Sequence, residues 1–378
     1  MTTARAAGGA DRVLGWDMLR GLCALAVASY HLMYWQGIAT VSTLGSYGVY
    51  LFFILSGASL AYNYESRLNT WREARSFLLV RWLRLAPLYV LVCVVFVTML
   101  SLRNGQWVDR LPLRFALNAS FAFGVNDPTV WALPVGGWSL GIEFIYYLAF
   151  PLLLAALPRT VWCVVLAAVL AFVQWAWVLN TAGSPAGYAA SAVAYHQAPA
   201  FAAYFFGGCV IGHWRRKGAA SLSITRGAWV WIAMAVLLLA LNPAEPGDEL
   251  LGVRGVVLFV ACFAVVFASG LVDVKGRMTR VAKFLGDITY GCYLLHPIFF
   301  FGFAWFVLPR ITDVEVTELP LAMRLLTLMA VLAASCLTAA ASERWFESPI
   351  RQWAKRITGG GRTMRPPRSQ SDAASISS

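Results

Sequence analysis

The chain has 378 residues, of which 60% are hydrophobic and only 13% are charged, and its mean hydropathy is +0.66. A soluble protein carries about 25% charged residues, so these few charges cannot cover a water-facing surface. The composition excludes a cytosolic enzyme, a disordered chain and a secreted disulfide scaffold. The net charge of +12 does not indicate nucleic-acid binding, because the basic residues fall between apolar runs. We predict an all-α polytopic membrane protein.

The apolar runs predict the membrane spans. A bilayer core needs about 20 apolar residues per helix, and such runs predict a bundle of about ten transmembrane helices. They lie near 13–36, 46–64, 77–100, 138–157, 160–180, 197–213, 227–241, 253–271, 284–308 and 321–346. The apolar stretch 111–124 is only half a span, so we expect a re-entrant or interfacial segment. The first run is full length and carries Asp17 and Arg20, so we expect a retained span rather than a cleaved signal peptide.

Three parts of the chain are expected from this pattern. Residues 1–12 form an N-terminal segment, 13–357 the transmembrane domain and 358–378 a tail that Gly, Pro and Ser predict to be disordered. No fused soluble domain is expected. The seven cysteines lie within apolar stretches without a CxxC pair, so we expect neither a disulfide framework nor a metal site.

The distribution of Lys and Arg predicts the orientation. Most of the 30 basic residues flank one side of the predicted spans. The other side carries only Arg103, Arg110, Arg114, Arg254, Arg310 and Arg324. By the positive-inside rule, the basic side is cytoplasmic, and both termini are then cytoplasmic.

The first predicted span carries three ionisable residues, which are costly inside a bilayer and therefore functional candidates. Arg20 and His31 are eleven residues apart, so at about 100° per residue they share one helix face. Asp17 precedes Arg20 by three residues and can pair with it. In the alternative interpretation, Asp17 and Arg20 form a structural pair and His31 hydrogen-bonds a neighbouring helix.

Two arginines, Arg81 and Arg84, open the third predicted span in the segment VRWLRLAPLY. They lie one turn apart and face the same way. They either extend to the cytoplasmic headgroups or form a phosphate clamp, because guanidinium binds phosphate in a bidentate manner.

Further polar candidates lie in the fourth and ninth predicted spans. Glu143 begins the fourth span from the outer side, at the expected depth of His31, where a carboxylate would orient an imidazole; it is otherwise an acid favoured by the helix dipole. His296 lies midway along the ninth span, and its alternative role is packing beside a proline. Ser139 is a further candidate near Glu143.

Six segments together resemble a known family. They are DMLRGLCALAVASYH, GVYLFFILSG, VRWLRLAPLY, WSLGIEFIYYLAFP, LGDITYGCYLLHPI and ERWFESPIRQW, between about residues 13 and 353. This chain resembles the membrane-bound acyltransferase 3 family, which O-acylates surface sugars and related molecules in bacteria. The resemblance rests most on an Arg, ten residues and a His in the first span, with RxxR opening the third.

The resemblance implies ten core helices and acyl-CoA as the donor substrate, with no permanently bound cofactor. It implies that His31 is catalytic and that Arg20, Arg81 and Arg84 bind the donor or organise the site. The chain departs from many relatives in two places. Phe144 follows Glu143 where a second acid is expected, and the sixth span lacks an arginine near its start.

The expected reaction is O-acylation, with acetyl as the default group and a polysaccharide or lipopolysaccharide sugar as acceptor. His31 would act as a general base or form an acyl-histidine, and the sequence does not choose between them. A glycolipid, a macrolide or another small hydroxylated metabolite is the alternative acceptor. A proton- or anion-coupled transporter is the alternative from another class, although no inverted repeat supports it. We expect a multi-pass protein of the bacterial inner membrane.

Overall fold

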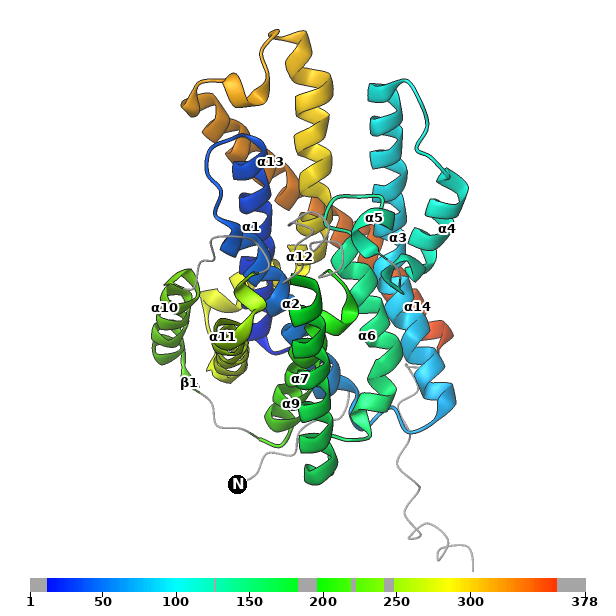
Figure 1. Ribbon diagram of the computed structural model, residues 1–378, viewed down its shortest axis with the longest axis vertical. Coiled ribbons are helices and arrows are strands. Elements are labelled where there is room, and N and C mark those ends of the chain that lie inside the picture. The colour runs from blue at the N-terminus through cyan, green and yellow to red at the C-terminus, as the bar shows by residue number, and fades with distance from the viewer. Residues whose placement is uncertain (1–11, 126, 183–195, 219–221, 241–247, 359–378) are drawn as a thin grey trace, which may run out of the picture.

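The computed structural model describes residues 12–125, 127–182, 196–218, 222–240 and 248–358. These residues form a bundle of α-helices (Figure 1). Within them, the only strands are β1 (Leu222–Ser223) and β2 (Val272–Asp273), which pair in parallel. The predicted all-α class is confirmed. Residues 1–11 of the expected N-terminal segment (1–12) and residues 359–378 of the expected tail (358–378) lie outside the described residues.

A helix lies at the position of each predicted span. These helices are α1 (Leu14–Trp35), α2 (Ser42–Tyr64), α3 (Trp71–Asn104), α6 (Trp138–Leu154), α7 (Thr160–Ala182), α9 (Ala202–Arg216), α10 (Ile224–Ala240), α11 (Gly252–Leu271), α12 (Arg277–Gly302) and α13 (Leu321–Ser342). The 3₁₀ turns η2 (Ala198–Phe201) and η3 (Asp248–Leu250) precede α9 and α11. The expected boundaries therefore differ from the observed ones by only a few residues at most ends.

Six helical segments of the described chain are long and apolar enough to cross a membrane. They are Ser42–Tyr64, Trp71–Asn104, Thr160–Thr181, Gly252–Leu271, Arg277–Arg310 and Leu321–Ile357. The protein is thus a polytopic membrane protein. The helices α1, α6, α9 and α10 are shorter or more polar, so the count of ten crossings stays a prediction.

The half-span expected at 111–124 consists of short helices. These are α4 (Leu111–Ser120), the 3₁₀ turn η1 (Ala122–Val125) and, after it, α5 (Pro128–Trp131). Asn118 fixes them to α3, because its Oδ1 accepts hydrogen bonds from the Tyr89 hydroxyl at 2.7 Å and the Leu133 N–H at 3.0 Å. Its amide also donates to the carbonyls of Arg114 and Trp131, so the buried polar side chain is fully partnered.

Glycines bring α2 and α9 into close contact. A Cβ atom at Gly208 would lie 2.0 Å from the Ile54 carbonyl oxygen, and one at Gly212 would lie 2.2 Å from that of Ala58. Small residues four apart on a membrane helix allow such a close approach of two backbones. The α2–α9 pair therefore depends on the absence of side chains at these positions.

The last two long helices continue through π-helical turns. The turns η4 (Phe303–Val307) and η5 (Leu308–Arg310) extend α12, and η6 (Val316–Glu318) follows in the loop before α13. The turn η7 (Glu343–Glu347) joins α13 to α14 (Ser348–Ile357). Figure 1 shows α13 beginning near the top of α12 and its chain continuing to α14 beside α3.

Candidate active site

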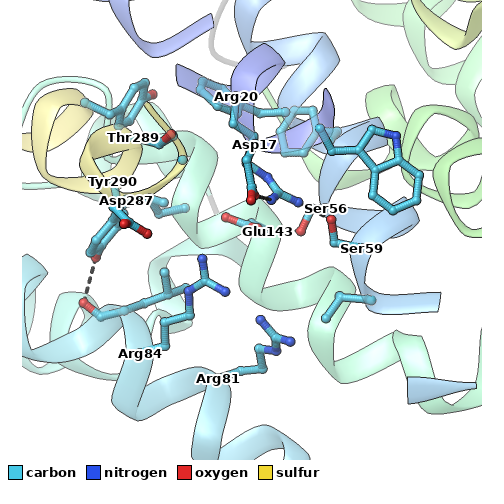
Figure 2. Close-up of a pocket in the computed structure, with 18 of the residues that line it drawn as sticks. Asp17, Arg20, Ser56, Ser59, Arg81, Arg84, Glu143, Asp287, Thr289 and Tyr290 are labelled. Atoms are coloured by element: carbon cyan, nitrogen blue, oxygen red, sulfur yellow. Dashed lines mark hydrogen bonds and ion pairs between the residues drawn. The ribbon is translucent and has the colours of Figure 1, made fainter. Parts of the chain in front are cut away.

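A cavity of about 320 Å³ lies between α1, α2, α3, α6 and α12, with η7 and α14 contributing to its wall. Its charged wall residues are five arginines and five acids, namely Arg12, Arg20, Arg81, Arg84, Arg351, Asp17, Glu143, Asp287, Glu343 and Glu347. Figure 2 shows Arg81 and Arg84 pointing into the cavity from α3, opposite Asp17 and Arg20 on α1. The cavity thus gathers charges from segments that are far apart in the sequence.

Arg12 and Arg20 are held by carboxylates within this wall. Arg12 forms ion pairs with Asp17 at 2.7 Å and with Asp287 at 2.8 Å. Burial lowers the pKa of the Arg12 guanidinium, but attraction to these two carboxylates prevails and raises the pKa above its usual value. Arg20 contacts Asp17 at 3.4 Å, as the three-residue spacing predicts, and donates hydrogen bonds to Ser59 and the Leu55 carbonyl. Both cations are therefore committed to partners within the protein.

Arg351 is held in the same way at another part of the wall. It forms an ion pair with Glu343 and lies 3.8 Å from Glu347. The Ser342 hydroxyl donates a hydrogen bond of 2.9 Å to Glu347. This cluster consists entirely of residues from the end of α13, η7 and α14, so α14 supplies part of the cavity wall.

Arg81 and Arg84 differ from the other three arginines. Within the described ranges, neither forms an ion pair with a carboxylate within 4.0 Å. The Cζ atom of Arg81 lies 5.0 Å from the ring centroid of Tyr64 and 5.7 Å from that of Tyr147. Its buried Nε has no hydrogen-bond partner among the residues that the structure describes. Two cations without acidic partners therefore face the cavity and are available to an anionic ligand.

The expected pairing of Glu143 with His31 is wrong. Glu143 accepts hydrogen bonds from Ser56, at 2.6 Å, and from Tyr147, and it lines the same cavity as Arg20. Two residues at a similar depth in the membrane are not in contact unless their helices also pack against each other. Here α6 packs against α2 and α3 near the cavity, whereas α1 packs against α12.

The partner of His31 is His296 on α12. Nδ1 of His31 lies 3.0 Å from Nε2 of His296, and neither residue belongs to the cavity wall. Tyr293 connects the two regions, because it lines the cavity and its ring lies edge-on to that of His296. The Tyr293 hydroxyl also lies 2.9 Å from Ser139 Oγ, so the candidate Ser139 belongs to the wall between the cavity and the histidines.

The comparison with known families decides which class of enzyme contains this site. The profile of the family described as an acyltransferase domain matches residues 13–340. The chain belongs to the acyltransferase 3 family. The matched residues include every helix that lines the cavity except η7 and α14, so the cavity belongs to the domain that defines this family.

One curated relative also matches the chain. The chain is 32% identical over 164 residues to Acyltransferase MdmB of Streptomyces mycarofaciens, and the alignment covers 38% of this chain and 41% of that protein. The chain thus spans less than half the length of this relative. No solved structure matches the chain.

Sequence reasoning missed several polar residues of the cavity. The missed residues are Ser56, Ser59, Tyr147, Asp287, Tyr290, Tyr293, Glu343, Glu347 and Arg351. Asp287, Tyr290 and Tyr293 repeat every three residues, the spacing of one helix face, in the segment LGDITYGCY. Glu343, Glu347 and Arg351 of ERWFESPIRQW are charged residues at the end of a predicted span, and this position also marks them as candidates. No cluster of three or more His, Cys, Asp or Glu residues arranged for a metal is present within the described residues.

Proposed function

We propose that this acyltransferase moves an acyl group, by default acetyl, from acyl-CoA to a hydroxyl of a cell-surface polysaccharide or lipopolysaccharide sugar. The observation that supports this most is the cavity with two arginines, Arg81 and Arg84, that have no acidic partner among the described residues. Coenzyme A is a multiply anionic cytosolic molecule, and its phosphates are the natural ligands for unpaired guanidinium groups. The arginines would bind the phosphates while the paired Arg12, Arg20 and Arg351 keep the wall in place.

The route from the donor to the reacting group follows α12. Asp287, Tyr290 and Tyr293 line the cavity at three-residue intervals, and His296 continues this series beyond it. Nine residues of α-helix span about 14 Å. The pantetheine arm of coenzyme A is thin and extended, and it would carry the thioester along this series toward His31.

His31 would act as the general base in the transfer. Its imidazole takes the proton of the acceptor hydroxyl as that oxygen forms a bond to the acyl carbon. The carbon–sulfur bond of the thioester breaks, and the proton is passed to the departing sulfur, which leaves as the coenzyme A thiol. In the acyl-histidine route the same imidazole first carries the acyl group.

The proposed orientation is consistent with a donor that enters from the cytoplasm. Arg81 and Arg84 lie on the basic side of the predicted spans, and both termini are proposed to be cytoplasmic in the bacterial inner membrane. His31 lies farther along α1, toward the proposed outer side, where an external hydroxyl would meet the thioester. Glycolipids, macrolides and other small hydroxylated metabolites are the acceptors to compare with surface sugars.

Thiol release from acyl-CoA tests the proposal directly. Purified full-length protein in nanodiscs receives acetyl-CoA labelled in the acetyl group, together with either a lipopolysaccharide oligosaccharide or a macrolide. Free thiol and label in the acceptor, both dependent on the acceptor, are expected. The absence of label in both acceptors contradicts transfer from acetyl-CoA to either of them. Label in the macrolide alone contradicts the sugar acceptor.

Mass spectrometry of surface glycans from cells with and without the protein tests the acceptor in its native setting. The expected result is an acetyl ester on a glycan that is absent from cells lacking the protein. Cells that produce a His31→Ala variant at an equal membrane level are the matched control and should lack the ester. Identical glycan spectra in all three strains would exclude a surface sugar.

A further inference from the structure

The two imidazoles of His31 and His296 form one hydrogen-bonded unit. The nitrogen atoms are 3.0 Å apart, the ring centroids 5.2 Å apart and the ring planes 12° apart. Nearly coplanar rings in edge-to-edge contact place the lone pair of one nitrogen in line with the N–H of the other. Trp35 follows His31 by one helix turn, and its ring lies parallel to the His31 ring, with 5.0 Å between the ring centroids. This stacking restricts the rotation of the His31 ring.

The backbone around His296 defines which nitrogen carries the proton. Nδ1 of His296 lies 3.2 Å from the carbonyl oxygen of Cys292, one turn earlier on α12. A carbonyl oxygen only accepts, so Nδ1 of His296 must carry the hydrogen. In a neutral imidazole the other nitrogen is then an acceptor, and Nε2 of His296 can only receive a hydrogen bond.

The same reasoning carries over to His31. Because Nε2 of His296 accepts, Nδ1 of His31 must donate, and the remaining nitrogen, Nε2 of His31, keeps its lone pair. Both rings are neutral in this arrangement. His296 is 1% exposed, and among the described residues no carboxylate forms a hydrogen bond or ion pair with either ring. An imidazolium without such a partner is costly to bury.

We propose that His296 is a positioning residue that fixes His31 in the tautomer with a basic Nε2. This inference rests on the proposed function of His31 as the group that takes the acceptor proton. When Nε2 takes that proton, Nδ1–H still donates to His296, and the hydrogen bond becomes charge-assisted. His296 thus orients the base before transfer and stabilises its charged form during transfer, without touching the substrate.

Nitrogen NMR of the histidine rings tests the proton positions without any assay of activity. The chain has only four histidines, so ¹⁵N-histidine labelling of the full protein in detergent micelles gives few signals. Single variants His31→Gln and His296→Gln assign the two relevant rings. Both rings should be neutral and protonated at Nδ1 near neutral pH. A His31 ring protonated at Nε2 overturns the proposal.

A His296→Leu variant tests whether His296 causes this tautomer. Without its acceptor, the His31 signals should move toward those of the Nε2-protonated form. Unchanged His31 signals in this variant would contradict the proposal. Because this measurement needs no donor or acceptor, it remains decisive even where the proposed substrates prove wrong.

Steady-state kinetics separate positioning from packing. His296→Gln keeps a carbonyl acceptor near the position of Nε2, whereas His296→Leu has none. We expect His296→Leu to lower kcat per folded molecule by about tenfold to 10²-fold, with KM for acyl-CoA unchanged, because the tautomer of the base is wrong. His296→Gln should recover most of that loss. Equal kcat in the wild type and the Leu variant, or an equal loss in both variants, contradicts the positioning role. If the Leu variant does not fold, the kcat of the Gln variant and the tautomers of the wild-type histidine rings still test the positioning role.

Discussion

Glu143 on α6 accepts a hydrogen bond of 2.6 Å from Ser56 on α2 and another from Tyr147, one turn later on α6. The carboxylate therefore joins two helices at the wall of the cavity that also contains Arg20. This relationship assigns Glu143 a role in the shape of the cavity. It also leaves His31 to be oriented by another residue.

We predict that Glu143→Leu destabilises the protein more than Glu143→Gln. Leucine leaves the hydroxyls of Ser56 and Tyr147 without their acceptor, and an unsatisfied buried polar group costs about 1–3 kcal/mol. Glutamine keeps one carbonyl oxygen for them. Thermal unfolding in detergent should show a lower Tm for the Leu variant than for the Gln variant. Equal Tm values would show that these hydrogen bonds contribute little.

Removal of Arg81 or Arg84 should weaken donor binding. Arg81→Ala and Arg84→Ala each remove a charge-assisted partner of a phosphate, worth about 1.5–3 kcal/mol, or roughly tenfold to a hundredfold in Kd for acyl-CoA. Lysine at either position should restore only part of the affinity, because it lacks the planar fork. Isothermal titration of the nanodisc-embedded protein measures these changes.

Arg103→Ala is the matched control for the two arginines. Arg103 belongs to the same helix, but it lies at the other end, where its guanidinium is 4.5 Å from the centroid of the Trp305 ring. Its loss should leave acyl-CoA affinity near that of the wild type. Equal affinity for Arg81→Ala, Arg84→Ala and the wild type would instead make both arginines membrane-surface anchors.

Local patterns in the sequence predicted part of the structure. The helix positions follow from the lengths of the apolar runs, because a bilayer requires every backbone group to be satisfied within a helix. The Asp17–Arg20 contact follows from a spacing of three residues. Such features depend only on neighbours along one helix, and they are readable without knowledge of the packing.

Contacts between distant helices could not be read in this way. His31 and His296 are 265 residues apart, and their pairing depends on how α1 packs against α12. Gly21 controls that packing, since a Cβ there would lie 2.4 Å from Leu285 Cβ. The predicted contact of Glu143 with His31 was wrong for the same reason. Its depth in the membrane was inferred from one helix alone, without the helices that pack against it.

The close contact of α2 with α9 yields a stability prediction. Gly208→Ala should sharply reduce the amount of folded protein in the membrane, because its Cβ would lie 2.0 Å from the Ile54 backbone oxygen. Gly302→Ala is the control, since its Cβ would meet only Met99 Cε at 3.7 Å. Fluorescence-detection size-exclusion chromatography measures both variants. A normal monodisperse peak for Gly208→Ala would mean that the two helices separate without penalty.

The proposed orientation predicts which positions are reached from outside the cell. Cysteines placed at Arg72, Arg216 and Arg277 should not react with an impermeant maleimide in intact cells, because the basic side faces the cytoplasm. A cysteine at Trp107, which is 68% exposed between α3 and α4, should react. Permeabilised cells should label all four. Labelling of the Arg72 position in intact cells contradicts the orientation.

The last prediction concerns His31→Ala. Loss of a general base costs about 10²–10⁴-fold in rate, whereas loss of a packing histidine mainly lowers the amount of folded protein. We expect His31→Ala to abolish acyl transfer per folded molecule while its membrane level stays near wild type. His296→Ala should be milder, because it removes only the partner that orients the base.

His213→Ala is the control that separates chemistry from packing. His213 is buried in a helix, at 5% exposure, but its Nδ1 pairs with Glu65 at 2.6 Å near the end of α9, and it lies outside the cavity wall. Its loss leaves the Glu65 carboxylate without this partner, so it should lower the yield of folded protein and leave the rate per molecule unchanged. Transfer of radiolabelled acetyl, normalised to the monodisperse peak, compares the three variants. A His31→Ala protein with the wild-type rate per molecule would move the base elsewhere. His296 would then be the first alternative, because it is the other imidazole of the pair and lies beside the Tyr293 wall of the cavity.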